Sequence, residues 1–377
     1  MKVLMLRDEH VYDIDNNQIL NGQLFPSITT VHNIGPSAVF DVWNKNRAYL
    51  KSNRTAERSV SLFGGEGTIE AKRRLSLSDS YWIKHDYDSD KMFADISPYF
   101  NDFSLLTLQS GHVRSSSVPD LVLGGSQPKQ WTRFENMATG DKTVIAMSKS
   151  EISEQVHAEI CAVKLAQVCG LPVMDAFVRC NAQTIYAKKY SPFFSYSELG
   201  VIHVVNMTTP AMSLVQFDQL NVGADGWCPE NVCYAYRRMG VSSDLEVLQS
   251  IALKQVLFDA VVGNGDRRLN NSNWGVFLDT ETGKREPSYM YDFNWAVLSV
   301  QNTEHLDAVA LNVRKRGCMK QEAIIFLESV RTTCAAIGLS QWRENSEYLI
   351  RKINFFPVNE RLPNSAPETH KPKFPRR

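Results

Sequence analysis

Two aspartates and an asparagine are spaced so that they can act together from one cleft. Asp266 is followed five residues later by Asn271, and a strand–turn–strand pattern then leads to Asp292 within Tyr-Asp-Phe. A single loop can point Asp266 and Asn271 the same way, and a hairpin can return Asp292 to the opposite side. Phosphoryl transfer needs a carboxylate beside the incoming hydroxyl and hard oxygen ligands for a bridging Mg²⁺. We therefore predict Asp266 as the catalytic carboxylate, with Asn271 and Asp292 as metal ligands.

Each of these residues also has an ordinary explanation when it is taken alone. Asp266 and Arg267 can form a surface ion pair, Asn270 and Asn271 can make a turn, and Asp292 can cap a strand end. Their combined order, directly after a long apolar helix pattern, favours the catalytic interpretation. Protein kinases carry a catalytic Asp, a metal-binding Asn five residues later and an Asp-Phe after a hairpin in this order.

Upstream of these residues, a glycine-rich stretch at 124–129 and the charged residues Lys149 and Glu159 fit the binding of nucleotide phosphates. The stretch lies between two strand patterns, as a loop that covers phosphates should, although glycine-rich hairpins are commoner than nucleotide loops. Lys149 ends a third strand pattern, where a kinase keeps the lysine that pairs with the phosphates. Glu159 in the next helix can orient it by an ion pair, whereas the competing Lys142 lies at a solvated turn. The predicted cofactor-binding residues are Gly124, Gly125, Ser126, Gln127, Lys129, Lys149 and Glu159.

The elements that must position these residues form a small strand-rich unit followed by a helical one. Short apolar runs bounded by turn residues predict the strands, and apolar residues at helical spacing between capping residues predict the helices. After residue 187 the pattern is mostly helical, apart from the hairpin before Asp292. Strands are expected at 2–6, 118–123, 131–134, 143–147, 173–178 and 184–187, and helices at about 154–169, 245–262 and 320–337, with Ser153 and Asp244 as caps and Gly170, Pro172 and Gly338 as stops.

Composition narrows the class of protein. The chain has 377 residues, of which 43% are hydrophobic, so it can bury a sizeable core. Lys and Arg number 41 and Asp and Glu number 41, and this balance argues against a strongly basic nucleic-acid binder. No apolar run is long enough for a membrane span, and the N-terminus lacks the pattern of a signal peptide. We expect a cytoplasmic protein without membrane or direct nucleic-acid partners.

Cysteines give no sign of a disulfide framework or a metal site. There are seven, an odd number, and they are spread along the chain without a CxxC pair. In the absence of an export signal, reduced thiols are the default. His157 and Cys161 are one helical turn apart, but no second pair at ligand spacing accompanies them.

The chain resembles the HipA-like serine/threonine kinases, in the branch found in Gram-positive bacteria and their phages. The motifs that carry this resemblance cover residues 70 to 300. They are the run Leu75–Lys84 (LSLSDSYWIK), the loop Gly125-x-x-Pro128-Lys129-x-Trp131, the loop Asp266-Arg267-x-x-x-Asn271, and Tyr291-Asp292-Phe293.

The resemblance implies an α+β, two-lobed protein-kinase-like fold, with a small β-rich N-lobe, a larger mainly helical C-lobe and an N-terminal extension. It implies ATP and Mg²⁺ as cofactors and transfer to a Ser or Thr hydroxyl of a protein. Some members of the family are toxins of toxin–antitoxin pairs, so an antitoxin-like partner is part of the expectation. The expected divisions are an extension at 1–105, an N-lobe at 106–195, a C-lobe at 196–360 and a disordered tail at 361–377.

Two departures from the family pattern lie in the catalytic loop. Arg268 occupies the position of the usual His, and Ser272-Asn273 lengthens the loop before Trp274-Gly275. Asn270 and Asn271 are therefore both open as the metal ligand, and the five-residue spacing favours Asn271. The family's regulatory Ser falls near Val122, with other serines close by at 115, 116, 117 and 126.

Two other functions are compatible with the same fold. A pseudokinase or partner-binding module would keep the fold without turnover, but it would not need Asp266, Asn271 and Asp292 together. Kinases of phosphoinositides or small molecules also use an Asp-x-x-x-x-Asn loop, and basic clustering beside it would favour a phosphoinositide. Arg267 and Arg268 supply only two basic residues for such a cluster, and we expect Arg267 to pair with a nearby acid instead.

Overall fold

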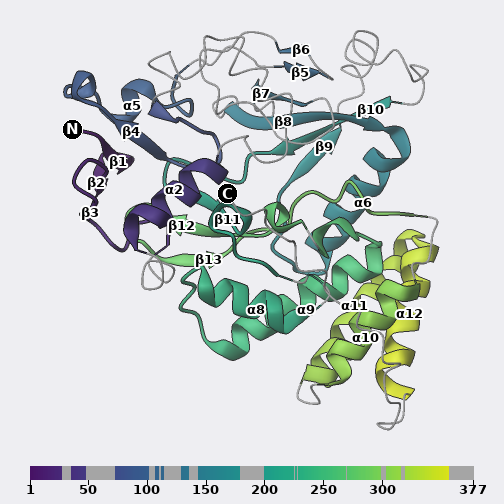
Figure 1. Ribbon diagram of the computed structural model, residues 1–377. Helices are drawn as coiled ribbons and strands as arrows, with labels where there is room; N and C mark the ends of the chain where they lie inside the picture. The colour runs from purple at the N-terminus through teal and green to yellow at the C-terminus, as the bar shows by residue number, and fades with distance from the viewer. Residues whose placement is uncertain are drawn as a thin grey trace, which may run out of the picture.

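A six-stranded sheet forms the smaller lobe of the computed structural model, with the strand order β6-β5-β7-β8-β10-β9 (Figure 1). Lys149 lies on β8 in the middle of this sheet, and α6 (Ser153–Val168) follows that strand directly. The structure describes residues 1–27, 35–47, 73–101, 107–109, 112–113, 129–135, 143–178, 199–224, 226, 228–268, 270–298, 303–315 and 319–355. The strands are β5 (Thr107–Gln109), β6 (His112–Val113), β7 (Lys129–Glu135), β8 (Thr143–Ile152), β9 (Ala176–Val178) and β10 (Leu199–Val205).

Helices make up most of the larger lobe (Figure 1). The central one is α9 (Leu245–Val262), which packs against the other four and is buried along most of its length. The side chain of Asp244 accepts from Glu246 N at its start, and Gly263 adopts φ 74° at its end. The predicted cap and length of this helix are confirmed, as is the helix at 320–337. The other helices are α8 (Pro229–Arg238), α10 (Thr303–Arg314), α11 (Lys320–Ile337) and α12 (Ser340–Phe355).

A three-stranded sheet lies beside the loop that carries Asp266. It contains β11 (Met212–Gln216), β12 (Gly275–Asp279) and β13 (Arg285–Pro287), and β12 pairs with both neighbours. The predicted hairpin before Asp292 is confirmed as β12 and β13. Gly275 is required where the strands meet, because a Cβ there would lie 2.8 Å from Val215 O.

The prediction of a mostly helical chain after residue 187 is wrong for two segments. β10 lies beyond the expected lobe boundary at 195 and pairs with β8 in the sheet of the smaller lobe, and β11 pairs with β12. Both are short apolar runs whose partners are distant in sequence. Such runs do not reveal from periodicity alone whether they are strand or helix.

Within the extension predicted at 1–105, which we call the N-terminal subdomain, the described residues form a four-stranded sheet with the order β3-β2-β1-β4. A cluster of aromatic rings joins this sheet to α2, with Tyr12 against Phe25 and Phe40, and Trp43 against Phe40 and Tyr81. The elements are β1 (Val3–Leu6), β2 (Glu9–Asp13), β3 (Gln18–Ile19), α2 (Pro36–Arg47), β4 (Tyr81–Lys84) and α5 (Phe93–Ile96). The strand predicted at residues 2–6 is therefore present.

A short segment, residues 206–211, runs from β10 to β11, and we call it the connector. Its first residue, Asn206, donates its backbone N–H to Ile145 O of β8 at 2.8 Å. Within the part of the chain that the structure describes, no helix combines the length and the apolar character needed to cross a membrane. The predicted strands at 118–123 and 184–187 and the tail at 361–377 lie outside the described residues.

Candidate active site

Lys149 is the centre of three charged groups that come from three different segments. Its ammonium group donates to Glu159 Oε1 of α6 at 2.9 Å and to Asp292 Oδ1 at 3.2 Å. The side chains of Lys149 and Glu159 are 1% and 0% exposed, whereas that of Asp292 is 24% exposed. The predicted ion pair between Lys149 and Glu159 is present, and the same lysine reaches the aspartate that the sequence places after the hairpin.

Burial makes these three charges depend on one another. A charged group that leaves water loses hydration, and only close, hydrogen-bonded partners of opposite charge offset that loss. Lys149 and Glu159 belong to the smaller lobe, and Asp292 follows β13, so the ammonium group also links the two lobes. Asp292 has the largest exposed fraction of the three, which makes its carboxylate the one that a ligand can most readily reach.

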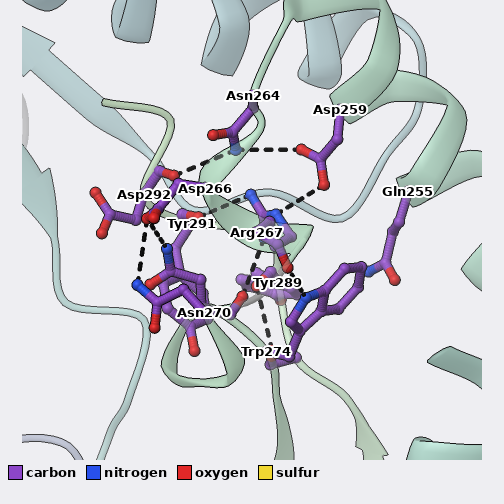
Figure 2. A network of polar contacts seen from close by, with 12 residues as sticks. Gln255, Asp259, Asn264, Asp266, Arg267, Asn270, Trp274, Tyr289, Tyr291 and Asp292 are labelled. Carbon is purple, nitrogen blue, oxygen red and sulfur yellow. Dashed lines mark hydrogen bonds and ion pairs between the residues drawn. The ribbon is translucent and has the colours of Figure 1, made fainter. Parts of the chain in front are cut away.

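The backbone around Asp292 is held in an uncommon conformation. Its φ is 59°, in the left-handed region that Asp tolerates better than most residues. Buried Asn264 donates its side-chain amide to Asp292 O at 3.4 Å and to Asp259 Oδ1 at 3.3 Å (Figure 2). Two residues earlier, Met290 N donates to Pro172 O at 2.9 Å. These anchors fix the direction in which the Asp292 carboxylate leaves the chain.

Asp266 lies in a short 3-10 turn, η5 (Asp266–Arg268), directly after α9. Its Oδ2 accepts from Asn270 Nδ2 at 3.2 Å and from Asn273 Nδ2 at 2.8 Å. Among the described residues both side-chain donors to this carboxylate bond Oδ2, and none bonds Oδ1. The two amides therefore fix the rotation of the carboxylate and leave Oδ1 for a further donor.

Arg267 is the buried hub that ties the loop carrying Asp266 to its surroundings (Figure 2). Its Nε lies 2.9 Å from Asp259 Oδ2, and its other nitrogens donate to Asn273 O at 3.2 Å and to Tyr291 O at 2.8 Å. Trp274 Nε1 donates back to Arg267 O at 2.8 Å. The acid that we expected Arg267 to pair with is Asp259 on α9. One guanidinium therefore fixes the distance between α9, the loop and the segment that carries Asp292.

The charge on Asp259 depends on this hub. Burial raises the pKa of Asp259 from 3.8 to about 6, although the Arg267 guanidinium acts in the opposite direction. The folded protein therefore binds this proton more tightly than the unfolded chain does. Between pH 4 and about 6 this group makes the free energy of unfolding fall as pH rises, and the ion pair with Arg267 is fully charged only above that range.

The two asparagines that the sequence left open have different environments. Asn270 turns toward Asp266, and its Oδ1 accepts from Ser272 N at 3.3 Å. Asn271 turns toward the segment before α8, where its Oδ1 accepts from Ala224 N at 3.0 Å. An amide oxygen has a second lone pair, so this contact leaves Asn271 able to act as a ligand.

Asn273 is the site residue that sequence reasoning missed. The sequence pattern gives it no role beyond its place in the lengthened loop, yet its side chain makes the shorter of the two amide contacts with Asp266. A second 3-10 turn, η6 (Asn271–Asn273), brings it back toward the carboxylate. Spacing from Asp266 gave no signal for this contact, because it depends on the turn.

The remaining predicted residues are only partly described. Gly124, Gly125, Ser126 and Gln127 lie outside the described residues, as does the competing Lys142. Lys129 is the first residue of β7, and its backbone is opposite Lys149 of β8 in the sheet register. The strand that would follow a phosphate-covering loop is thus adjacent to the strand that carries Lys149.

Comparison with known proteins identifies the architecture. No family model matches the chain, and no curated protein matches it. HipA from Shewanella oneidensis MR-1, solved in a toxin–antitoxin complex of HipA, HipB and operator DNA, is 13% identical, with a TM-score of 0.56 over 94% of this chain and 96% of that chain. The Helicobacter pylori proinflammatory kinase CtkA is 14% identical, with a TM-score of 0.35 over 56% of this chain and 88% of that chain.

The likeness to HipA shows a shared fold. The chain has a mixed α+β, two-lobed kinase-like fold, as the sequence led us to expect. In that fold, Lys149 and Glu159 come from the small lobe, and Asp266 and Asp292 come from the segments on either side of the β12–β13 hairpin.

The hub generates a prediction about stability. Arg267→Met leaves the Asp259 carboxylate buried without its cation and removes the donors to Asn273 O and Tyr291 O, so the free energy of unfolding should fall by about 3–5 kcal/mol at pH 7. Urea denaturation followed by circular dichroism measures this change.

The matched control is Asp307→Asn on α10. Asp307 is 49% exposed in a 3.0 Å ion pair with Lys352, so its loss should cost less than about 1 kcal/mol. Equal losses in the two variants would contradict the assignment of Arg267 as a hub. The decline in stability with rising pH should also extend above pH 6 in Arg267→Met but not in Asp307→Asn, because the Asp259 carboxylate then titrates without its cation.

Proposed function

We propose that this chain is an ATP- and Mg²⁺-dependent protein kinase that transfers the γ-phosphate to a Ser or Thr hydroxyl. The observation that carries the proposal is the contact of one buried lysine, Lys149, with Glu159 and Asp292 across the two lobes. Asp266 supports it from the adjacent loop, where two amides orient its carboxylate.

The residues around Lys149 fit a nucleotide and its metal. Mg²⁺ is usually held by one or two carboxylates together with phosphates and water, and not by a closed protein cage. Asp292 offers a partly exposed carboxylate, and Asn271 is the proposed second ligand. The described part of the chain contains no group of three or more His, Cys, Asp or Glu that could hold a metal by itself. Bound Mg²⁺ and ATP supply the transferable phosphoryl group and neutralise its charge.

Each protein group then has a separate task. Lys149 pairs with the phosphates, and Glu159 keeps its ammonium group directed into the cleft. Asp292 holds the metal. Asp266 orients the acceptor hydroxyl and receives its proton through Oδ1, while Asn270 and Asn273 hold Oδ2. Asn264 and Arg267 are positioning residues, because they contact the segments that carry Asp292 and Asp266.

The alternative of a phosphoinositide kinase is less well supported. It required a basic cluster beside the catalytic loop, for which the sequence offered Arg267 and Arg268. Arg267 is 1% exposed and is committed to Asp259 and Tyr291, so it is not available to an anionic head group. Transfer to a Ser or Thr hydroxyl does not require a basic cluster beside this loop.

The proposal extends to a biological setting. We infer a cytoplasmic toxin of a toxin–antitoxin system with an antitoxin-like protein partner, supported by the fold shared with HipA, which was solved with HipB. The acceptor protein is best identified by phosphoproteomics of cells that express the wild type or a variant with Asp266 replaced. Sites phosphorylated only with the wild type are the substrates.

The proposal predicts that Asp266→Asn lowers phosphoryl transfer by about 10²- to 10⁴-fold, the usual contribution of a general base. ATP affinity should be kept, since Lys149 and Asp292 hold the nucleotide independently. The measurement is transfer of labelled γ-phosphate to a protein acceptor, with a thermal-shift titration of ATP on the same variant. Asp307→Asn serves as the control and should transfer at the wild-type rate. Wild-type transfer in Asp266→Asn would refute the mechanism.

A second prediction concerns the metal. Asp292→Asn replaces an anionic oxygen by a neutral amide of similar shape, so the enhancement of ATP binding by Mg²⁺ should be lost. Calorimetric titration of ATP with and without Mg²⁺ tests this on the wild type and the variant. If the variant keeps the wild-type dependence on Mg²⁺, Asp292 is not the metal ligand.

A further inference from the structure

A four-residue segment of the N-terminal subdomain, Leu77–Ser80, lies against the connector between the lobes. It belongs to the LSLSDSYWIK run, which carries part of the family resemblance but has no role in the proposed chemistry. We call this segment the clasp. It directly precedes β4, so it belongs to the subdomain and not to either lobe.

The clasp and the connector share a dense set of hydrogen bonds. Leu77 O accepts from Asn206 Nδ2 at 3.0 Å and from Thr208 Oγ1 at 2.6 Å. Ser80 Oγ donates to Pro210 O at 3.1 Å. The contact therefore extends along the connector from its first residue to its fifth.

The clasp continues onto the first half of β11. Ser78 O accepts from Leu214 N at 2.8 Å, and Ser80 N donates to Ser213 Oγ at 2.9 Å. Leu77, Ser80, Thr208 and Ser213 are all buried, at 1%, 0%, 5% and 0% exposed. Buried polar groups of this kind are costly to leave unpaired, so the clasp and the connector move together or separate at a high cost.

The connector is the mechanical link between the two halves of the proposed site. At one end Asn206 N bonds Ile145 O of β8, the strand that carries Lys149. At the other end β11 pairs along its length with β12, and Phe217 N donates to Trp274 O of the catalytic loop at 3.0 Å. A change in the connector therefore alters the position of Lys149 relative to Asp292.

The subdomain that bears the clasp is itself fixed to the larger lobe. Arg285 of β13 is buried and donates to Pro26 O at 2.7 Å and to Met239 O at 3.1 Å. Asn46 of α2 donates its side-chain amide to Asp218 O at 3.2 Å. The clasp thus joins the connector to a subdomain that is anchored on the larger lobe.

We propose that the N-terminal subdomain sets the orientation of the two lobes, through the clasp on the connector, and so keeps Lys149 in reach of Asp292. The residues of the contact are positioning residues, and their effect on turnover rests on the proposed kinase function. Their effect on Lys149 does not, because the contact between Lys149 and Asp292 is present without a nucleotide.

The test is the double variant Thr208→Val/Ser213→Ala, which removes the two side-chain hydroxyls through which the connector and β11 bond the clasp and leaves every proposed catalytic residue intact. The matched variant Thr208→Ser keeps the hydroxyl on Thr208's side of the contact. Lys149 serves as the reporter, through its rate of modification by an amine reagent, measured by mass spectrometry. Lys254 on α9, 38% exposed, provides the reference rate in the same sample.

Loss of the clasp should raise the modification of Lys149 relative to Lys254 by about tenfold, the population shift expected for one or two lost hydrogen bonds. The affinity for Mg²⁺ and ATP should fall by a similar factor, and Thr208→Ser should remain within about twofold of the wild type on both measures. An unchanged Lys149 rate in the double variant overturns the proposal, as does an equal rise at Lys254, which would mark general loosening.

Two further outcomes keep the inference separate from the proposed function. If the wild type does not bind ATP, the kinase proposal fails, while a selective rise at Lys149 still supports the clasp. If the double variant does not fold, Ser213→Ala alone carries the test, because Ser213 Oγ is the acceptor for Ser80 N. A normal Lys149 rate in that single variant overturns the proposal.

Discussion

A buried ammonium group loses its hydration, and Lys149 offsets that loss with one carboxylate from its own lobe and one from the other. This requirement shapes much of the structure. β8 must end beside α6, the hairpin must bring Asp292 to Lys149, and the lobes must keep a fixed orientation. The partial exposure of Asp292 leaves one side of the group open, and this is where an anionic ligand with its metal can compete for the lysine.

A second buried cation, Arg267, organises the loop in the same way. It pairs with Asp259 on α9 and donates to the backbone at Asn273 and Tyr291, so the loop that carries Asp266 and the segment that carries Asp292 share one support. The two cations have different consequences. Lys149 has carboxylate partners in both lobes, whereas the partners of Arg267 named above all lie within one lobe.

The features that depend on local spacing could be predicted from the sequence. The Asp244 cap, the hairpin after the catalytic loop and the ion pair of Lys149 with Glu159 follow from neighbouring residues. Features whose partners are distant in the chain could not be predicted from the sequence. The strands β10 and β11 are short apolar runs that only their pairing with β8 and β12 makes recognisable. Asn273 reaches Asp266 only through a 3-10 turn, and nothing in the LSLSDSYWIK run indicates that its carbonyls bind the connector and β11.

The most direct measurement of the central claim is a crystal structure of the chain with Mg²⁺ and a non-hydrolysable ATP analogue. The account predicts that the phosphates lie between Lys149 and Asp292, that the metal contacts the Asp292 carboxylate, and that Asp266 Oδ1 faces the terminal phosphate. The Arg267 hub should be unchanged. A nucleotide bound elsewhere, or phosphates that leave the contact between Lys149 and Asp292 intact, would contradict it.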